Sequence, residues 1–232
     1  MASSAVRPEY EALSRDMEHV AAHFGLVFDE ALRADLASLA RTFETIDRHV
    51  DATPTSAARA VLCARIVGAL RDGPGPAVLD PELAERLAWV RGVYGDRTGA
   101  FADELARFFG VSERLRTTSS RRTYISCVLG EARCASTMTL MLDPRLRGAE
   151  FARFFEVLSE VANLVDKLHD VRDDRRRGEI AIRPGVRVHA RLAGTFAARS
   201  ARLLRMSPRP LELARWGARY LREVTPAEPL RA

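Results

Sequence analysis

With 232 residues, 47% of them hydrophobic, the chain is long enough to enclose one sizeable core, and its lack of any run of about 18 apolar residues argues against a transmembrane helix. The three cysteines form no Cys-x-x-Cys pair, and the polar start of the sequence lacks the apolar segment of a secretory signal, so we predict a cytoplasmic protein without disulfides. The net charge is +5, but all basic residues except Lys167 are arginines scattered along the chain, which we interpret as compositional bias, and we predict no nucleic-acid partner.

The hydrophobic pattern predicts an all-α chain, because apolar residues recur at spacings of three and four and no stretch alternates with period two. Asp29 caps a predicted helix that runs to about Asp51, and Thr53-Pro54 and Asp80-Pro81 each start another with a cap followed by proline. Residues 71–79 form the clearest loop. Further helices are predicted over residues 8–24, 99–109, 119–142, 147–175, 186–206 and 209–222. We expect a single domain of about nine helices over residues 1–232, with frayed ends at 1–7 and 225–232.

The helix predicted to end at Asp51 carries two stripes of opposite character. The apolar stripe, which should face the core, consists of Leu32, Leu36, Leu39, Phe43, Ile46 and Val50. Glu44, Asp47 and Asp51 form an acidic stripe about a quarter turn away, at the boundary of the core. Like charges one turn apart repel, so Asp47 and Asp51 favour a cation between them, and Mg²⁺ prefers such oxygen ligands. The alternative is a solvated helix end without a ligand.

A second acidic pattern lies in the helix predicted over residues 147–175. Five polar residues recur there with helical spacing and share one face: Asn163, Asp166, Asp170, Asp173 and Asp174. The same face continues backwards through small and aromatic residues, which are not typical of a solvated surface: Ala162, Ser159 and Phe155. We therefore interpret the acidic end as the mouth of a cavity and the preceding turns as its apolar wall. Divalent cations and the arginines at 175–177 would balance a phosphate-bearing ligand there, and the alternative is an ion-pair cluster of those arginines with the aspartates.

The stretch DKLHDVRDDRRRGEI at residues 166–180 resembles the second aspartate motif of the class I isoprenoid synthases, above all that of the squalene and phytoene synthase branch. It also resembles the metal triad of bacterial terpene cyclases, and the matching residues are Asp166, Asp170 and Asp174. Asp47 and Asp51 are similar to the first motif of the family, although the doubled aspartate of the cyclases is missing. Arg219-Tyr220 resembles the Arg-Tyr pair that reaches the substrate diphosphate in the cyclases.

The resemblance implies an all-α bundle around a central apolar cavity and a magnesium-dependent terpene synthase. Such an enzyme ionises a linear prenyl diphosphate, farnesyl or geranylgeranyl diphosphate, cyclises the carbocation and releases diphosphate. The catalytic residues would be Asp47, Asp51, Asp170 and Asp174, with Asp166 as a further metal ligand. The candidates for contact with the diphosphate are Arg121, Arg122, Arg219 and Tyr220. The candidates for the cavity wall are Phe43, Phe155, Ser159, Ala162 and Trp216.

Two departures from the family pattern keep alternatives open. His169 stands where the family has arginine and Asp166 where it has asparagine, and the chain is short, which favours a cyclase over an enzyme that joins two prenyl diphosphates. Condensation of two prenyl diphosphates remains an alternative within the enzymes. A non-catalytic helical binding protein with a degenerate synthase fold is the alternative from another class. The sequence leaves the oligomeric state open, with a homodimer as one alternative.

Overall fold

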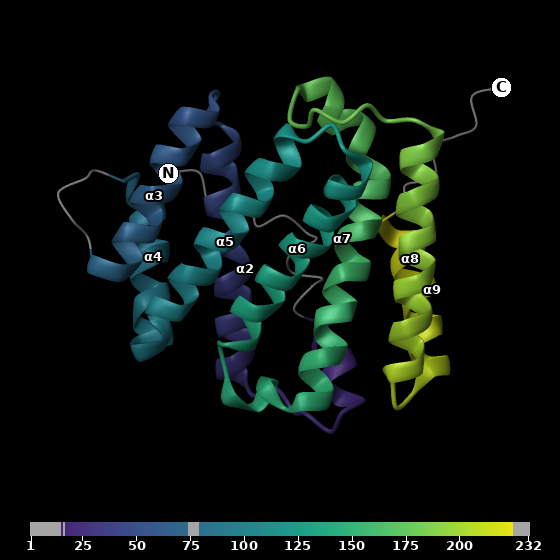
Figure 1. The fold of residues 1–232 in the computed structure, drawn as a ribbon. Helices are drawn as coiled ribbons and strands as arrows, with labels where there is room; N and C mark the ends of the chain where they lie inside the picture. The colour runs from purple at the N-terminus through teal and green to yellow at the C-terminus, as the bar shows by residue number, and fades with distance from the viewer. Residues whose placement is uncertain (1–14, 16, 74–78, 225–232) are drawn as a thin grey trace.

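The computed structural model describes residues 15, 17–73 and 79–224, and every regular element in these residues is a helix (Figure 1). The α-helices with defined bounds are α2 (Glu30–Asp51), α3 (Ser56–Asp72), α4 (Pro81–Tyr94), α5 (Thr98–Thr117), α6 (Arg121–Leu140), α7 (Ala149–Arg177), α8 (Val186–Met206) and α9 (Pro210–Val224). Two short 3-10 helices, η1 (Gly95–Arg97) and η2 (Pro144–Arg147), precede α5 and α7. The predicted all-α class is confirmed. Within the predicted helix 8–24, residues 17–22 are helical; residues 8–14 and 16, the ends predicted to fray and residues 74–78 lie outside the described residues.

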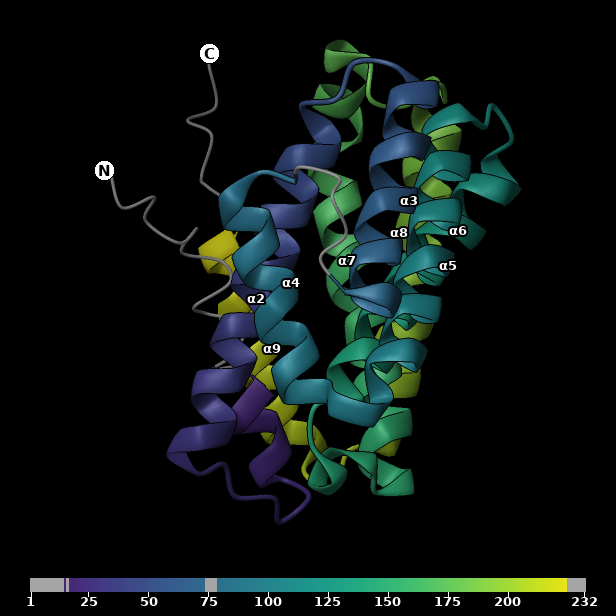
Figure 2. The same cartoon turned by 90° about the vertical axis from the view of Figure 1, so that its left-hand side faces the viewer.

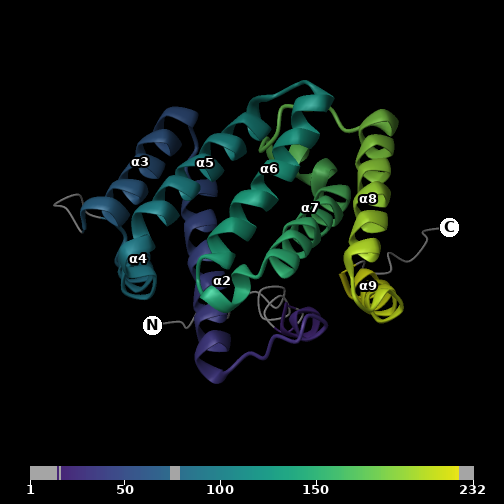
Figure 3. The ribbon, with the colours of Figure 1, turned by 60° about the horizontal axis from the view of Figure 1, so that its bottom comes forward.

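The long helices pack as neighbours and run alternately up and down the bundle (Figures 1 and 3). α5 packs on α6, α6 on α7 and α7 on α8, and α3 packs on α5. α2 packs against α4, and both lie on one side of this row (Figure 2). As a result, the carboxyl ends of α2, α5 and α7 lie at the upper end of Figure 1, together with the amino ends of α3, α6 and α8. The two acidic motifs, which lie in the last turns of α2 and α7, are therefore brought to the same end of the bundle.

Capping side chains explain where α2, α3 and α4 begin. Asp29 accepts a hydrogen bond from a backbone N–H three residues on at 2.8 Å, and Asp80 accepts one from two residues on at 3.0 Å, as predicted. The start of α3 corrects the prediction, because its cap is Thr55 and not Thr53. The hydroxyl of Thr53 donates instead to the carbonyl of His49 at 2.8 Å, so Thr53 belongs to the end of α2.

Most of the predicted helix boundaries lie within two residues of those observed, and α8 agrees at both ends. The exception is α5, which continues to Thr117 although the prediction ends at residue 109. A glycine inside a helix costs about 1 kcal/mol, and Gly110 lies just beyond the predicted end. The helix nevertheless continues, because Leu115 is buried in an apolar cluster shared with α6 and α7. Tertiary packing thus outweighs the local preference.

Three apolar clusters form the core. The largest joins α2, α3, α4 and α5 and contains the apolar stripe of α2, of which all residues are buried except Phe43, which is partly buried. The second joins α6 to α7 and to the segment after it, and the third lies between α7, α8 and α9. Tyr94 is fully buried, and its hydroxyl donates to the carbonyl of Met138 at 2.8 Å, which ties α4 to α6.

Within the described ranges, no helix combines the length and the hydropathy needed to cross a membrane. Cys63, Cys127 and Cys134 are free thiols. Burial raises the pKa of Cys63 to about 11 and that of Cys134 to about 12, so both thiols are protonated at neutral pH.

Candidate functional site

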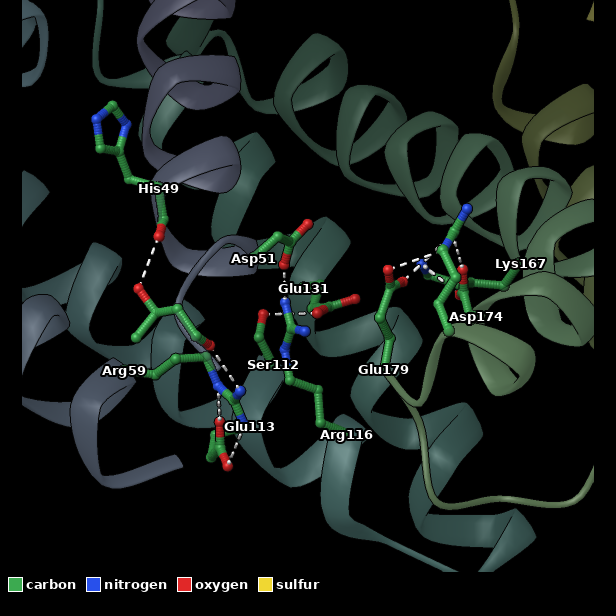
Figure 4. Close-up of polar contacts among 12 residues, drawn as sticks. His49, Asp51, Arg59, Ser112, Glu113, Arg116, Glu131, Lys167, Asp174 and Glu179 are labelled. Carbon is green, nitrogen blue, oxygen red and sulfur yellow. Dashed lines mark hydrogen bonds and ion pairs between the residues drawn. The ribbon is translucent and has the colours of Figure 1, made fainter. Parts of the chain in front are cut away.

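The two acidic helix ends lie on either side of three charged residues, two from the neighbouring helices and one from α7 itself (Figure 4). Asp51 ends α2, and Asp174 lies in the last turn of α7. Between them in the close-up are Arg116 from α5, Glu131 from α6 and Lys167 from α7. We call these five residues the polar cluster. Four helices contribute to it because the carboxyl ends of α2, α5 and α7 and the body of α6 meet at this end of the bundle.

At the first acidic motif, Arg116 supplies the positive charge. Its guanidinium donates to the carboxylate of Asp51, and its charge also acts on the partly buried Asp47. Burial lowers the pKa of Arg116, but the hydrogen bond and the charges of these carboxylates outweigh burial and raise it. The neighbouring turn of α5 is fixed as well, because Arg59 Nε lies 3.1 Å from Glu113 Oε2.

At the second acidic motif, Lys167 and Arg177 supply the positive charge. Lys167 Nζ lies 3.4 Å from Asp174 Oδ2 and 3.5 Å from Asp166 Oδ2, and Arg177 Nη2 donates to Asp174 Oδ1 at 2.7 Å. The buried Asp174 is therefore paired at both oxygens. Asp170 lacks such a hydrogen bond in the described part of the chain. Burial and the charges of Asp166 and Asp174 raise its pKa, so it is the least compensated member of the triad.

The five polar residues predicted to share one face of α7 do not share one environment. Asn163 Nδ2 donates to the carbonyl of Val128 in α6 at 2.7 Å. Asp173 is exposed and pairs with Arg176 at 2.9 Å. The interacting set is thus the triad at residues 166, 170 and 174, which is also the set picked out by the resemblance.

Glu131 links the two motifs. Its side chain lies between those of Arg116 and Lys167 in Figure 4, and Ser112 Oγ donates to its Oε1 at 2.6 Å. Burial raises the pKa of Glu131, while the positive charge of Lys167 and the hydrogen bond from Ser112 act against that rise. A carboxylate between two cations makes the cluster continuous from α2 to α7.

Magnesium is the ion that the resemblance implies, and the carboxylate oxygens of the two motifs suit it chemically. Their arrangement does not fit it: in residues 15, 17–73 and 79–224, no three His, Cys, Asp or Glu side chains are placed to hold one ion. Arg116, Lys167 and Arg177 compensate the aspartates instead. The described residues therefore do not form a preformed magnesium site, and the alternative interpretation of the α7 end as an ion-pair cluster describes the arrangement that is seen.

The residues predicted to contact a diphosphate fall in two separate places. Arg121 and Arg122 are exposed in the first turn of α6, at the same end of the bundle as the acidic motifs. Arg219 is exposed on α9, while Tyr220 is partly buried with its ring stacked on that of Trp216, the centroids 5.6 Å apart. The guanidinium that reaches the first acidic motif is that of Arg116, which the sequence analysis did not single out.

An apolar pocket of about 320 Å³ lies between α7, α8 and α9. It is lined by four of the predicted wall residues and by Tyr220; the four are Phe155, Ser159, Ala162 and Trp216. On α7 the lining continues to Val165, and Asp166 is the next residue. The acidic end of α7 thus begins where the wall of the pocket ends.

Phe43 does not belong to this pocket. Its ring stacks on that of Phe101 at a centroid distance of 6.4 Å, within the core shared by α2 and α5. The cause is its place on the apolar stripe of α2, which packs on the neighbouring helices. A central cavity between the two acidic motifs stays a prediction, because the pocket described above lies beside α7.

Arg116 and Glu131 are the functional candidates that the sequence analysis missed. Glu131 follows Tyr124 by seven residues and Val128 by three, so it lies on the same face of α6 as these buried residues. A carboxylate on an otherwise buried helix face could have been recognised in the sequence as a functional candidate. Lys167 offered a signal too, as the one lysine of the chain set among aspartates. Arg116 offered none, because arginine is common in the last turn of a helix.

Comparison with known proteins does not extend the assignment, since no protein-family model matches the chain and no curated protein matches it. The polar cluster and the apolar pocket are therefore the features from which a function can be inferred.

Proposed function

We propose that this chain is a class I terpene synthase-like enzyme that binds a linear prenyl diphosphate, farnesyl or geranylgeranyl diphosphate. The observation that carries the proposal is the course of α7, whose apolar pocket wall gives way within one turn to an acidic end. A prenyl diphosphate has the same division, because an apolar chain is joined to a highly charged head. The pocket would take the chain, and the end of the bundle with the acidic motifs would take the head.

The proposed reaction breaks the bond between the allylic carbon and the diphosphate oxygen. The diphosphate leaves with the bonding electrons, the carbocation cyclises, and loss of a proton gives a cyclic hydrocarbon. Apolar walls such as Phe155 and Trp216 would fold the chain and keep water from the cation. The charge that develops on the diphosphate needs positive groups nearby, and Arg116 and Lys167 are positive groups at this end of the bundle, each already engaged with carboxylates.

Magnesium can take part in the proposed reaction only if it displaces a basic side chain from the acidic motifs. Arg116, Lys167 and Arg177 compensate the carboxylates of the two motifs, so an ion bound there would have to displace at least one of them. Measuring diphosphate release with and without Mg²⁺ shows whether the ion is required.

A non-catalytic prenyl-diphosphate binding protein is the second candidate, and one observation favours it. Asp51 and Asp174 are each paired with a cation of the chain, which makes the cluster stable without a metal. Such a protein would use the same pocket and leave the carbon–oxygen bond intact.

The two candidates are separated by offering the full chain geranyl, farnesyl and geranylgeranyl diphosphate singly, with and without Mg²⁺. Diphosphate release is measured together with the hydrocarbon products, by gas chromatography, and binding is measured in parallel. Release with a cyclic product supports the synthase, and binding without release supports the binding protein. Release only from a mixture of two substrates would indicate condensation. If the protein neither binds nor cleaves any of the three substrates, both candidates are contradicted.

Matched aspartate variants test the placement of the site. If release requires Mg²⁺, Asp170→Asn and Asp47→Asn should each abolish it, because each variant removes a carboxylate that would hold the ion. Asp173→Asn should retain it, since Asp173 lies in the same turn of α7 but is exposed and pairs with Arg176. Equal activity in Asp170→Asn and Asp173→Asn would show that the triad is placed wrongly.

A further inference from the structure

The last two helices, α8 and α9, carry a strong positive charge, whereas the rest of the chain is slightly negative. Residues 181–224 contain ten arginines, no lysine and two acidic residues, Glu212 and Glu223, which gives a formal charge of +8. Because the whole chain carries +5, the remaining residues together carry −3. The arginines are spread along the chain, but the acidic residues that balance them are nearly absent after Glu179. A charge asymmetry of this kind points to an anionic partner.

This basic segment forms α8 and α9, which lie at one edge of the bundle (Figures 1 and 3). Within the described part of the chain, two of its ten arginines make ion pairs, Arg199 with Glu160 at 3.1 Å and Arg209 with Glu212 at 3.4 Å. The other eight are exposed. The edge therefore presents positive charge that the fold does not neutralise.

The outer face of α8 has a distinct composition. Four arginines recur on this face with helical spacing: Arg187, Arg191, Arg202 and Arg205. The residues that lie between them on the same face are small, such as Gly194 and Ala198. A shallow hollow of about 500 Å³ lies there, with Arg191, Arg199 and Arg202 around these small residues. The inner face is apolar and buried at Val188, Leu192 and Leu203. α8 is thus a basic amphipathic helix whose hollow suits a phosphate group held between guanidiniums.

We propose that the α8–α9 edge docks on an anionic phospholipid surface. Exposed apolar side chains accompany the positive charge at both ends of α8: Val186 is 86% exposed and Leu211, at the start of α9, is 75% exposed. Arginine side chains reach phosphate head groups while their stems lie along apolar surface. Together these features match a helix that lies flat on an anionic surface and is held there through its outward arginine face, while its apolar face stays packed in the core. The proposal does not depend on the proposed function.

A nucleic acid is the other polyanion to consider, and the composition of the edge favours lipid. Side-chain amides, which read bases, are absent from residues 181–222. The aromatic side chains on which bases would stack are partly buried and line the apolar pocket: Phe196, Trp216 and Tyr220. The edge therefore offers charge and apolar contact, but it has neither the amides that pair with adenine nor fully exposed aromatic rings.

Flotation of the full chain with vesicles tests the proposal. Vesicles of phosphatidylcholine with phosphatidylglycerol should bind the protein, vesicles of phosphatidylcholine alone should not, and binding should weaken as salt is raised. Each arginine at an anionic surface contributes about fivefold to partitioning, so the triple variant Arg191→Glu, Arg202→Glu and Arg205→Glu should lower it by about two orders of magnitude.

The matched control is the triple variant Arg41→Glu, Arg114→Glu and Arg153→Glu, which makes the same charge change at exposed positions on α2, α5 and α7. It should retain most of the binding, and circular dichroism should show that both triples are folded. Three outcomes would overturn the proposal: equal binding to both kinds of vesicle, equal loss in the two triples, or full binding by the α8 triple. Tighter binding of duplex DNA or RNA than of anionic vesicles at physiological salt, lost in the α8 triple, would assign the edge to nucleic acid.

Discussion

Replacing Lys167 by methionine tests whether this lysine holds the polar cluster together. Its ammonium lies between the carboxylates of Asp166 and Asp174, and its charge also acts on Glu131. The side chain of Lys167 is 20% exposed and that of Asp174 is 6% exposed, so water screens their pairing only weakly. Methionine keeps most of the length of the lysine and removes its charge.

The expected cost follows from the charges left behind. Removing one partner of a buried ion pair costs about 3–5 kcal/mol, because the remaining charge has no compensation. Arg177 still pairs with Asp174, and Asp166 is exposed, so we expect the lower end, about 3 kcal/mol. With a urea dependence of about 2 kcal/mol per molar, the unfolding midpoint should fall by about 1.5 M, as followed by circular dichroism.

The pH dependence and a charge-conserving control sharpen this test. Burial lowers the pKa of Lys167, but the charges of Asp166, Asp174 and Glu131 outweigh burial and raise it. A lysine whose pKa is raised on folding contributes fully below its unfolded pKa of about 10.4, so the effect should be constant between about pH 6 and pH 9. Lys167→Arg should retain most of the stability, and Glu131→Gln should recover part of the loss in the methionine variant. A loss below about 0.5 kcal/mol in Lys167→Met, typical of an ordinary surface position, would refute the reasoning.

Three further predictions concern other parts of the molecule. Asp170→Asn should raise the stability by about 0.5 kcal/mol at pH 7, because it removes a like charge one turn from each of two carboxylates. The pKa of Asp170 is raised, so this gain should disappear as the pH falls through that pKa, and a gain independent of pH would contradict the assignment. Tyr94→Phe should lower the free energy of unfolding by about 1–2 kcal/mol, because it leaves the buried carbonyl of Met138 without the hydroxyl that donates to it. An unchanged midpoint temperature of thermal unfolding would show that this hydrogen bond contributes nothing to stability. Ser159→Phe should fill the apolar pocket and weaken the binding of farnesyl diphosphate by about tenfold, as measured by intrinsic tryptophan fluorescence. Unaltered binding would show that the prenyl group binds outside this pocket.

Local signals account for what could be predicted from the sequence. The caps at Asp29 and Asp80 and the bounds of α8 depend on residues within one or two turns, so they are visible without the fold. The wall of the pocket on α7 was visible for a similar reason, because Phe155 and Ser159 continue a face that becomes acidic at Asp166. A change of character along one helix face is a property of that helix alone.

The partners of the acidic residues could not be predicted in the same way. Arg116 reaches Asp51 across 65 positions of the sequence, and the register of α5 against α2 decides whether they meet. Glu131 stands between the motifs because α6 packs between α5 and α7. Phe43 illustrates the converse, since an aromatic residue beside an acidic stripe lies in the core as soon as its own stripe packs on a neighbouring helix. Such contacts follow from tertiary packing, which no single helix encodes.

The charge balance of the two acidic motifs gives a test that separates the two proposed functions. The motifs and Glu131 carry six carboxylates, on Asp47, Asp51, Glu131, Asp166, Asp170 and Asp174, and the charges of Arg116, Lys167 and Arg177 act on them, although Arg177 also pairs with Glu179. Burial raises the pKa of Glu131 and that of Asp170, so this excess of negative charge becomes smaller as the pH falls. A diphosphate entering alone would meet net repulsion, so further cations must accompany it or the arginines that start α6 must turn towards it. Diphosphate release that requires Mg²⁺ would show the former, and tight binding of a prenyl diphosphate without any divalent cation would show the latter and favour the binding protein.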